Sequence, residues 1–406
     1  MNPHGTSPLP PTSEPSPALR LLPLAAIVLF GFLAIGLPLA ALPLYLHGVQ
    51  GFDTVTVGWV VGIQSLATVL TRQMAGNYCD RHGSKASALV GLPMAALAGL
   101  VYLLSTFAPA GHVSLGVLVI GRLMMGLAES LFLTGTMTWG IARIGPSRTG
   151  MVMAWQGIAM FAAFGIGSPA GIAVMQQWGF TGVAIAAILL PLIALCIALV
   201  LPAVAKPGSG RARESMLSVI GVVWRPGLAM ALGTIPFSVI TTFLVLYYGD
   251  KGWAGAGVSV ASFTAGYIAV RLFLAHLPDR LGGRKVGAVS VFVQMVGLLM
   301  LWWAPSQLLA LLGCTLTGIG LSLVFPAMGV EAMRHVAPER RGLAIGCFVA
   351  FIDLSTAIAG PLMGAVIGLS GYPAVFICSA LLCVAALALM LWGLGDRRAP
   401  QAHVQG

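Results

Sequence analysis

The sequence predicts an all-α integral membrane protein whose twelve transmembrane helices form two pseudo-symmetric halves of six. First, 58% of the 406 residues are hydrophobic and 8% are charged, whereas soluble domains carry about 25% charged residues. Second, the chain contains a series of apolar runs long enough to cross a bilayer. Third, short motifs of the first half recur in the second half. With so few charges to face water, most of this apolar surface is expected to face lipid.

Twelve apolar runs define the predicted helices in chain order. A helix needs about 20 mostly apolar residues to cross the hydrocarbon core, and the runs end where charged residues or clusters of Gly and Pro interrupt them. The runs are 21–47, 55–76, 86–107, 113–141, 150–175, 180–202, 227–248, 257–277, 286–304, 307–334, 342–369 and 374–395.

The remaining segments divide the chain into domains. Residues 1–19 are rich in Pro and Ser and lack an apolar core, which predicts a disordered cytoplasmic tail rather than a signal peptide. Residues 203–226 form the longest connection, which is basic and predicts a cytoplasmic linker. The linker separates an N-terminal half, 20–202, from a C-terminal half, 227–395, and residues 396–406 form a second cytoplasmic tail.

Basic residues of the connections are concentrated on one side of the predicted membrane. The connections after odd-numbered runs offer Lys251 alone. The connections after even-numbered runs contain Arg81, Lys85, Arg143, Arg148, Lys206, Arg211, Arg213, Arg225, Arg280, Arg284, Lys285, Arg340 and Arg341. Because cytoplasmic loops carry the excess of Lys and Arg, both termini and all even-numbered connections are predicted to be cytoplasmic. The net charge of +10 therefore reports topology, and the lack of Lys/Arg runs interleaved with aromatic residues argues against nucleic acid as a partner.

The two halves share residues in a constant register. At an offset of 199 the pairs are Arg72 with Arg271, Asp80 with Asp279, Arg81 with Arg280 and Gly83 with Gly282. At an offset of 192 they are Pro146 with Pro338, Arg148 with Arg340, Gly150 with Gly342, Pro169 with Pro361, Gly179 with Gly371 and Phe180 with Tyr372. Two six-helix halves in parallel repeat are an architecture of secondary transporters.

The connection between the second and third runs reads GNYCDRHGSK, residues 76–85. It resembles the loop 2–3 signature of the major facilitator superfamily, G-x-x-x-D-R-x-G-R/K-R/K. The matching residues are Gly76, Asp80, Arg81, Gly83 and Lys85, with Ser84 in place of one basic residue. The copy in the second half comprises Asp279, Arg280, Gly282, Arg284 and Lys285, with Ala275 in place of the first Gly. The resemblance covers all twelve runs and implies a transporter of the bacterial inner membrane.

This signature is interpreted as a cytoplasmic gate. Its carboxylates could pair with Arg or cap a neighbouring helix, holding that face shut until the halves rock. We expect Gly83 to form a tight turn and Gly76 to allow close helix approach. Arg72 and Arg271, eight residues before the repeated Asp residues, are expected at the cytoplasmic interface as part of the gate. The alternative is topogenic charge with an ordinary turn.

Four ionisable residues inside apolar runs are candidates for proton coupling or the substrate cavity: Arg122, Glu129, Asp353 and Glu331. The segment Arg122–Gly126 is similar to the superfamily's R-x-x-Q-G motif of the fourth span, which implies proton coupling, although Met125 replaces the Gln. Glu129, two turns further on the same face, is the candidate proton carrier. The alternative is a fixed buried pair between Arg122 and Glu129.

The other two acids have structural alternatives. Asp353 could serve helix packing, and Glu331 could simply reach the cytoplasmic surface. The polar side chains of Gln64, Gln156 and Trp155 could contribute to a cavity, but packing is the preferred interpretation of each.

The fifth run contains GIAMFAAFGIGSPAG, which resembles the antiporter motif of that span in the same superfamily. The corresponding residues are Gly157, Gly165, Gly167, Pro169 and Gly171, with Ser168 where a Gly would precede the Pro. Small residues allow tight helix packing, and Pro bends the helix. The resemblance favours export over import; the alternative is an ordinary packing face.

Taken together, these features predict a secondary transporter rather than an enzyme. The sequence contains no HExxH, P-loop or strand-linked GxGxxG motif, and we expect no metal and no cofactor. The resemblance implies alternating access and proton-coupled efflux of a drug, sugar or metabolite, as in the drug- and arabinose-efflux-like branch. The expected partners are a small-molecule substrate, protons and the lipid bilayer, with the protein a monomer. Proton-coupled uptake by symport and a non-transporting scaffold or receptor remain alternatives.

Overall fold

The computed structural model describes residues 16–145, 148–204, 217–334, 336 and 341–393, and it is all-helical over these ranges. The predicted tails lie almost entirely outside the described residues, as does the centre of the predicted linker. The α-helices are α1 (Pro17–Pro43), α2 (Thr54–His82), α3 (Ser84–Phe107), α4 (His112–Ile144), α5 (Thr149–Val200), α6 (Leu217–Asp250), α7 (Ala256–Leu274), α8 (Leu277–Leu281), α9 (Gly283–Trp302), α10 (Gln307–Ser322), α11 (Val324–Met333), α12 (Arg341–Ser370) and α13 (Ala374–Ala388). Two π-helical turns, Leu44–Val49 and Leu389–Gly393, extend α1 and α13.

Eleven helical segments in the described part of the chain are long and apolar enough to cross a membrane. One of them, α5, has 52 residues and would be about 78 Å long if straight, far more than one bilayer. It is broken at Gly179, whose φ of 64° lies in the left-handed region that favours glycine. Its two arms correspond to the fifth and sixth predicted runs, so the all-helical fold of twelve crossings is confirmed.

The seventh crossing begins earlier than its apolar run. Helix α6 starts at Leu217, inside the segment 203–226 that is predicted as a linker. The stretch LSVIGVVW is itself apolar and continues the helix toward the connection. With 34 residues, α6 is about 51 Å long and exceeds the thickness of the bilayer.

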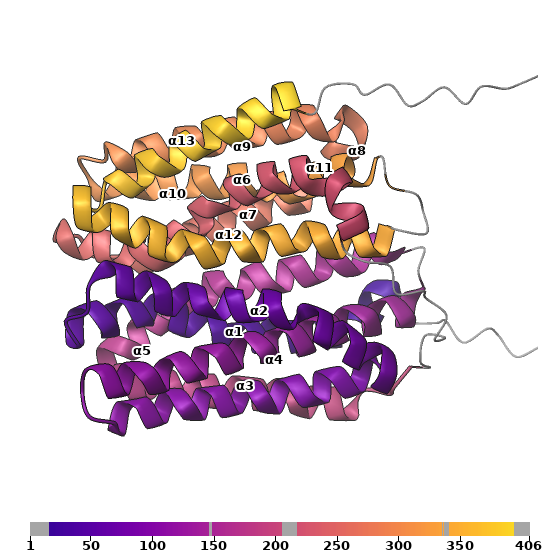
Figure 1. Cartoon of the computed structure of the whole chain (residues 1–406), viewed down its shortest axis with the longest axis horizontal. Helices are drawn as coiled ribbons and strands as arrows, with labels where there is room; N and C mark the ends of the chain where they lie inside the picture. Colours follow the sequence, from indigo (N-terminus) through magenta and orange to yellow (C-terminus); the bar gives the residue numbers. More distant parts are fainter. Residues whose placement is uncertain (1–15, 146–147, 205–216, 335, 337–340, 394–406) are drawn as a thin grey trace, which may run out of the picture.

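The two halves form separate layers in Figure 1, with α1 to α5 in one and α6 to α13 in the other. They meet where α2 packs on α12 and where α5 packs on α7. The motif connections at Gly83 and Gly282, together with α8, lie at one end of the bundle, which we call the basic end. The opposite end, where α2 starts and α12 finishes, is called the distal end.

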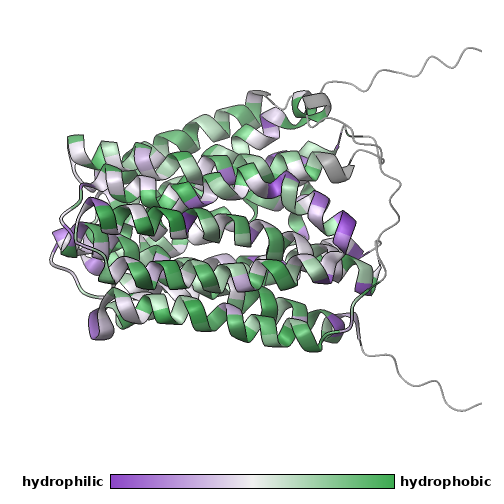
Figure 2. Ribbon diagram, turned by 60° about the horizontal axis from the view of Figure 1, so that its bottom comes forward, coloured by the Kyte–Doolittle hydropathy of each residue, from purple (hydrophilic) through white to green (hydrophobic). Residues whose placement is uncertain are grey.

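Hydropathy is distributed as a bilayer requires. Figure 2 shows hydrophobic residues along the flanks of the helices and hydrophilic residues concentrated toward the two ends of the bundle. Large apolar side chains on the flanks are exposed, among them Leu70, Ile120 and Phe292. Lipid would cover these side chains, as expected for a multi-pass membrane protein.

Candidate functional site

Three ionisable residues lie near the middle of helices that cross the membrane. At 1.5 Å per residue, Glu129 lies about 26 Å from the start of α4 and about 23 Å from its end. Arg72 lies about 27 Å from the start of α2 and about 15 Å from its end. Asp353 lies about 18 Å from the start of α12. All three therefore sit at the depth of the hydrocarbon core.

Arg72 and Asp353 form an ion pair between the two halves. The Nη2 atom of Arg72, on α2, donates a hydrogen bond to Oδ2 of Asp353, on α12. Their side chains are 21% and 17% exposed. Arg72 thus lies inside the bundle, about 15 Å from the end of α2, and not at the interface expected from sequence. The carboxylate on the facing helix compensates its charge where water is scarce.

Glu129 is held by the same face of α2. Its Oε2 atom accepts hydrogen bonds from Gln64 Nε2 at 2.9 Å and from Thr68 Oγ1 at 3.3 Å. Both Arg72 and Asp353 lie within electrostatic range of Glu129. We call these five residues the central polar cluster. Gln64, Thr68 and Arg72 are spaced by four, so they share one helix face. From sequence, Gln64 is a possible cavity residue for which packing is preferred, and Thr68 is not singled out; the spacing of four is the signal that could have placed both beside Arg72.

Arg122 does not belong to this cluster. Its Nε and Nη2 atoms donate to the carbonyl oxygens of Val60 and Val61 at 3.1 and 2.8 Å, and the residue is 2% exposed. Over the described ranges it forms no ion pair with Glu129, so the alternative of a fixed Arg122–Glu129 pair is wrong for this conformation. Two helical turns separate the two residues by about 10 Å, and Arg122 uses its charge to tie α4 to α2.

Glu331 also lies apart from the cluster, at the basic end. Its Oε1 atom accepts a hydrogen bond from the backbone N–H of Arg284 at 3.0 Å, in the first turn of α9. Its Oε2 atom lies 3.7 Å from Nη1 of Arg334. A carboxylate at this position satisfies a free helix N–H and complements the helix dipole. The structure therefore gives Glu331 a capping contact at the basic end, apart from the central polar cluster.

The gate signature adopts the predicted turns in both halves. Gly83 has a φ of 97° and Gly282 a φ of 88°, so each ends one helix and starts the next in a conformation that favours glycine. The expectation for Gly76 is wrong in this conformation, because a Cβ built there meets nothing within 4 Å. Among the described residues, no neighbouring segment packs closely on α2 at that position.

The charged residues of the signature face solvent. The side chains of Asp80, Arg81, Asp279 and Arg280 are exposed. Of the hydrogen bonds and ion pairs between described residues, none involves these four side chains. In this conformation these four side chains therefore make no gate contact with the described residues.

The basic residue that ends the signature has the same contact in both halves. Lys85 Nζ donates to the carbonyl oxygens of Leu199 and Leu201 at 2.9 and 2.6 Å, at the end of α5. Arg284 Nη2 donates to the carbonyl oxygen of Leu391, at the end of the last crossing. Both cations therefore bind free carbonyls at a helix C-terminus, where positive charge is favourable. They join helices within one half and not across the halves.

The distal end holds the halves in backbone contact. Thr54 Oγ1, on α2, donates to the carbonyl oxygen of Gly364, on α12, at 2.8 Å. One turn further along α2, a Cβ built on Gly58 would lie 2.1 Å from the carbonyl oxygen of Gly360. Only glycine allows this approach. The distal end is therefore closed where α2 meets α12.

The motif of the fifth run contacts two helices with two faces. A Cβ on Gly171 would lie 2.2 Å from the carbonyl oxygen of Leu37, and one on Gly167 would lie 3.0 Å from the backbone of Gly36, so this face packs on α1. Gly165 meets the side chain of Thr264, and Pro169 meets Gly257, both on α7 of the other half. The motif is therefore a packing element at the interface between the halves.

Arg271 lies on the same interface. Its Nη1 atom donates to the carbonyl oxygen of Ser322 at 2.8 Å, where α10 ends. Its guanidinium lies 5.7 Å from the ring centroid of Tyr267, and a Cβ on Gly157 would lie 3.5 Å from Nη2. Like Arg72, it lies inside the bundle, but it contacts a carbonyl and aromatic rings instead of a carboxylate.

The fold consists of two layers of membrane-crossing helices that are related by a sequence repeat and joined by a membrane-embedded ion pair. This architecture is that of a multi-pass transporter for small molecules. The chain belongs to the Major Facilitator Superfamily, whose family profile it matches over residues 24–261 and 254–406. Members of this superfamily are transporters and not enzymes.

Relatives cover nearly the whole chain. An uncharacterized MFS-type transporter of Salmonella typhimurium is 36% identical over 92% of this chain and 96% of its own length. Similar proteins of Burkholderia mallei and Pseudomonas aeruginosa are 39% and 40% identical, covering 93% and 95% of this chain and 93% and 96% of their own lengths.

Solved structures show the same fold. The human organic anion transporter MFSD10 aligns with a TM-score of 0.71 at 18% identity, over 93% of this chain and 100% of its own. A mutant of the nucleoside transporter NupG aligns with a TM-score of 0.74 at 17% identity, over 92% of this chain and 99% of its own.

Proposed function

We propose that this transporter exports a small organic molecule in exchange for protons, by alternating access. The observation that carries the proposal is the Arg72–Asp353 ion pair, which joins the two halves at mid-membrane depth beside Glu129. Ionisable groups at this depth are costly and usually serve ion or substrate pathways. A pair that also bridges two moving halves links the charge of one carboxyl group to the conformation of the whole protein.

The contacts around the pair support a state open to the cytoplasm. Positive-inside topology assigns the basic end and both termini to the cytoplasm of a bacterial inner membrane. The distal end is closed by the Gly58–Gly360 contact, and the gate residues of the basic end are unpaired among the described residues. To open the distal end, α2 and α12 must separate at the Gly58–Gly360 contact; in the proposed cycle this movement breaks the Arg72–Asp353 pair.

Protons and substrate would compete for this pair. A proton on Asp353, or a hydrogen-bond donor or cationic group of the substrate bound to Asp353, removes the attraction that holds the pair together. Because the Asp353 carboxylate cannot bind both ligands at once, binding of one disfavours the other, which is the thermodynamic condition for antiport. Glu129 offers Arg72 a second partner within its own half once Asp353 is neutral.

The substrate class is a drug, sugar or metabolite that carries polar groups. The structural neighbours named as organic anion and nucleoside transporters support an organic solute with hydrogen-bonding or charged groups. Gln64, Thr68 and Arg72 would supply the donors for such a solute. The protein is proposed to act as a monomer.

Export is favoured over uptake by the fifth-span motif, which lies at the interface between the halves. Symport would use the same cluster, with proton and substrate bound together. A scaffold without transport gains nothing from a pair that is costly to place inside a membrane.

The test measures proton movement in proteoliposomes that enclose a pH-sensitive dye. A panel of drugs, sugars and nucleosides is added to wild type, Glu129→Gln and Asp353→Asn. The matched control is Glu331→Gln, which makes the same chemical change in a carboxylate that caps α9. We expect substrate-driven proton movement in wild type and in the control, and its loss in both cluster variants.

The direction of proton movement, or its absence, distinguishes antiport from symport, from transport without protons and from a non-transporting scaffold. Proton and substrate fluxes in the same direction would replace antiport by symport. Substrate exchange without proton movement in any variant would exclude proton coupling. Retained coupling in both Glu129→Gln and Asp353→Asn would remove the central polar cluster from the mechanism. No flux with any compound would favour the scaffold.

A further inference from the structure

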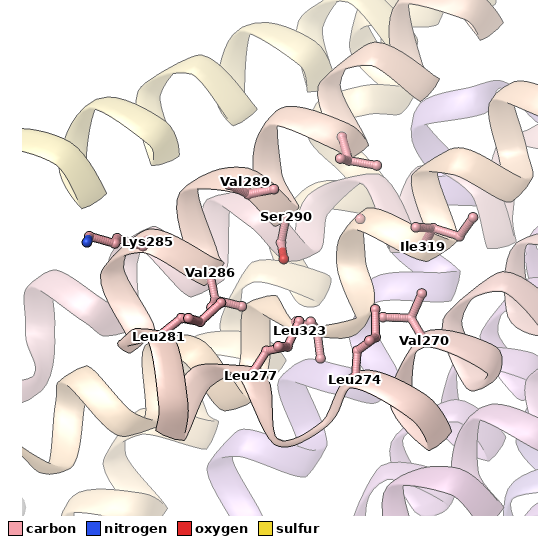
Figure 3. Close-up of a pocket in the computed structure, with 12 residues that line it drawn as sticks. Val270, Leu274, Leu277, Leu281, Lys285, Val286, Val289, Ser290, Ile319 and Leu323 are labelled. Atoms are coloured by element: carbon pink, nitrogen blue, oxygen red, sulfur yellow. The ribbon is translucent and has the colours of Figure 1, made fainter.

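An apolar groove lies on the outside of the second half, at the basic end (Figure 3). Helix α10 forms its floor, because α10 packs against both α7 and α9, which flank it. The short helix α8 closes the groove at the basic end through Leu277 and Leu281. Gly320 lets α10 approach α9, since a Cβ there would lie 2.4 Å from the backbone nitrogen of Gln294. The cavity has a volume of about 350 Å³.

The groove has the length and position of one lipid chain. Its lining extends along α9 from Lys285 to Val293, a rise of about 12 Å. One leaflet contributes about 15 Å of hydrocarbon. Because α8 and the start of α9 lie at the basic end, the groove begins at the headgroup region and follows the helix toward the middle of the bilayer. Its walls are aliphatic apart from Lys285 and the Ser290 hydroxyl, which Figure 3 shows among Val286, Val289 and Leu323.

A single cation stands at the mouth of this groove. Figure 3 shows the Lys285 amine directed away from the apolar residues, at the end of the groove nearest α8. The residue is exposed, and its amine takes part in no hydrogen bond or ion pair with the described parts of the chain. Its neighbour Arg284 is already bound to the carbonyl oxygen of Leu391, and Lys85 of the first half binds two carbonyls. Lys285, like Arg81 and Arg280, is therefore unpaired among the described residues, and of these three cations it is the one that lines the groove.

We propose that the groove binds one acyl chain of an anionic phospholipid of the cytoplasmic leaflet, with Lys285 at the phosphate. Basic side chains between transmembrane helices at the cytoplasmic face attract anionic headgroups. The nearby segment 276–285 carries Arg280, Arg284 and Lys285 against the single carboxylate of Asp279, so the mouth is electropositive. An acyl chain matches the aliphatic walls, and a net negative headgroup matches the mouth.

A second groove of the same protein provides an internal comparison. It lies along α5 beside Gly182 and is lined by Val174, Trp178, Ile185 and Leu189. Its volume is about 510 Å³, and no charged residue lines it. Lipid chains that enter this groove meet no cation, so their occupancy does not depend on headgroup charge.

The experiment measures lipid binding to the full-length protein in detergent by native mass spectrometry. Phosphatidylglycerol, phosphatidylcholine and phosphatidylethanolamine are titrated separately. We expect wild type to bind its first phosphatidylglycerol about fivefold more tightly than either zwitterionic lipid. Lys285→Gln should remove this preference, and Val289→Trp, which fills the groove, should remove the tight site. Lys251→Gln and Ile185→Trp, at the distal end and in the second groove, should leave the preference intact.

Each contrary result overturns the proposal. Equal affinity for phosphatidylglycerol and phosphatidylcholine in wild type excludes a headgroup-selective site. Affinity for phosphatidylethanolamine equal to that for phosphatidylglycerol excludes recognition by net charge. A preference that survives Lys285→Gln excludes this cation. Val289 is 64% and Leu281 is 59% exposed, so a larger side chain at either position has room in the groove, and Leu281→Trp serves as a second groove-filling variant. A tight phosphatidylglycerol site that survives both substitutions excludes the groove.

Discussion

The glycine contact at the distal end makes a direct prediction about conformational equilibrium. A Cβ added at Gly360 would lie 2.3 Å from the carbonyl oxygen of Gly58, whereas carbon–oxygen contacts between helices are ordinarily about 3.3–3.6 Å. The Gly360→Ala variant must therefore separate α2 and α12 by about 1 Å at this level. Overpacking of this kind costs about 1–3 kcal/mol, which shifts a two-state equilibrium by about 5- to 150-fold. The shift disfavours the state with a closed distal end.

Distances between spin labels at Val49 and Lys251 report this opening. Both residues are exposed at the distal end, one in each half, and the native cysteines are replaced for labelling. We expect Gly360→Ala to populate longer distances than wild type. The matched control is Gly368→Ala on the same helix, where a Cβ meets nothing within 4 Å. Alanine there improves helix propensity by up to about 1 kcal/mol and should leave the distances unchanged.

The same distance distribution for Gly360→Ala and Gly368→Ala would refute this prediction. That result would mean that the α2–α12 contact adjusts to a methyl group within the closed state. The glycines would then matter for packing and not for the choice between conformations.

Two further predictions concern the ends of the helices. Lys85→Ala removes two hydrogen bonds to the end of α5 and should lower the free energy of unfolding by about 1–2 kcal/mol. Thermal unfolding in detergent measures this change. The control is Lys251→Ala, because the Lys251 side chain makes no such contact with the described residues. Asp53 caps α2 through a 2.7 Å hydrogen bond from the Thr56 N–H; hydrogen bonds from Thr56 hold the pKa of this carboxyl below its ordinary value of 3.8. The ionised cap therefore stabilises the protein above that value and less as the pH falls through the lower pKa of the folded state. Asp53→Ala should cost about 1 kcal/mol at neutral pH, and a loss as large at pH 2 as at pH 7 would contradict an ionised cap.

The fold could be predicted from sequence because the bilayer imposes a length and a hydropathy on each crossing. The turn at Gly179 between two apolar runs was visible for the same reason, although the helix continues on both sides of it. The repeat also located the turns at Gly83 and Gly282, since a left-handed backbone demands glycine wherever it recurs. These features depend on local sequence alone.

The partners of the buried charges could not be predicted. Spacing along one helix shows that Arg122 and Glu129 share a face, but their hydrogen bonds go to residues of α2. Arg72 and Asp353 are separated by 281 residues, and only the packing of α2 on α12 brings them together. Glu331 looked like the other membrane acids until the start of α9 was placed beside it. The pairing of these buried charged residues is determined by how the helices pack against one another.

The sequence repeat becomes more informative once these contacts are known. Arg72 and Arg271 occupy equivalent positions, on α2 and α7, the helices through which each half contacts the other. The register that pairs Pro169 with Pro361 also pairs Phe161 with Asp353. Phe161 stacks on Tyr267, with ring centroids 3.6 Å apart, so an aromatic contact stands at the α5–α7 interface where the α2–α12 interface has a carboxylate. Protonation can change the contact of the Asp353 carboxylate at the α2–α12 interface, but it cannot change the aromatic contact at the α5–α7 interface. The two-fold architecture therefore carries its proposed proton-sensitive contact on one side, which gives the proton a defined place to act while the other side keeps the halves together.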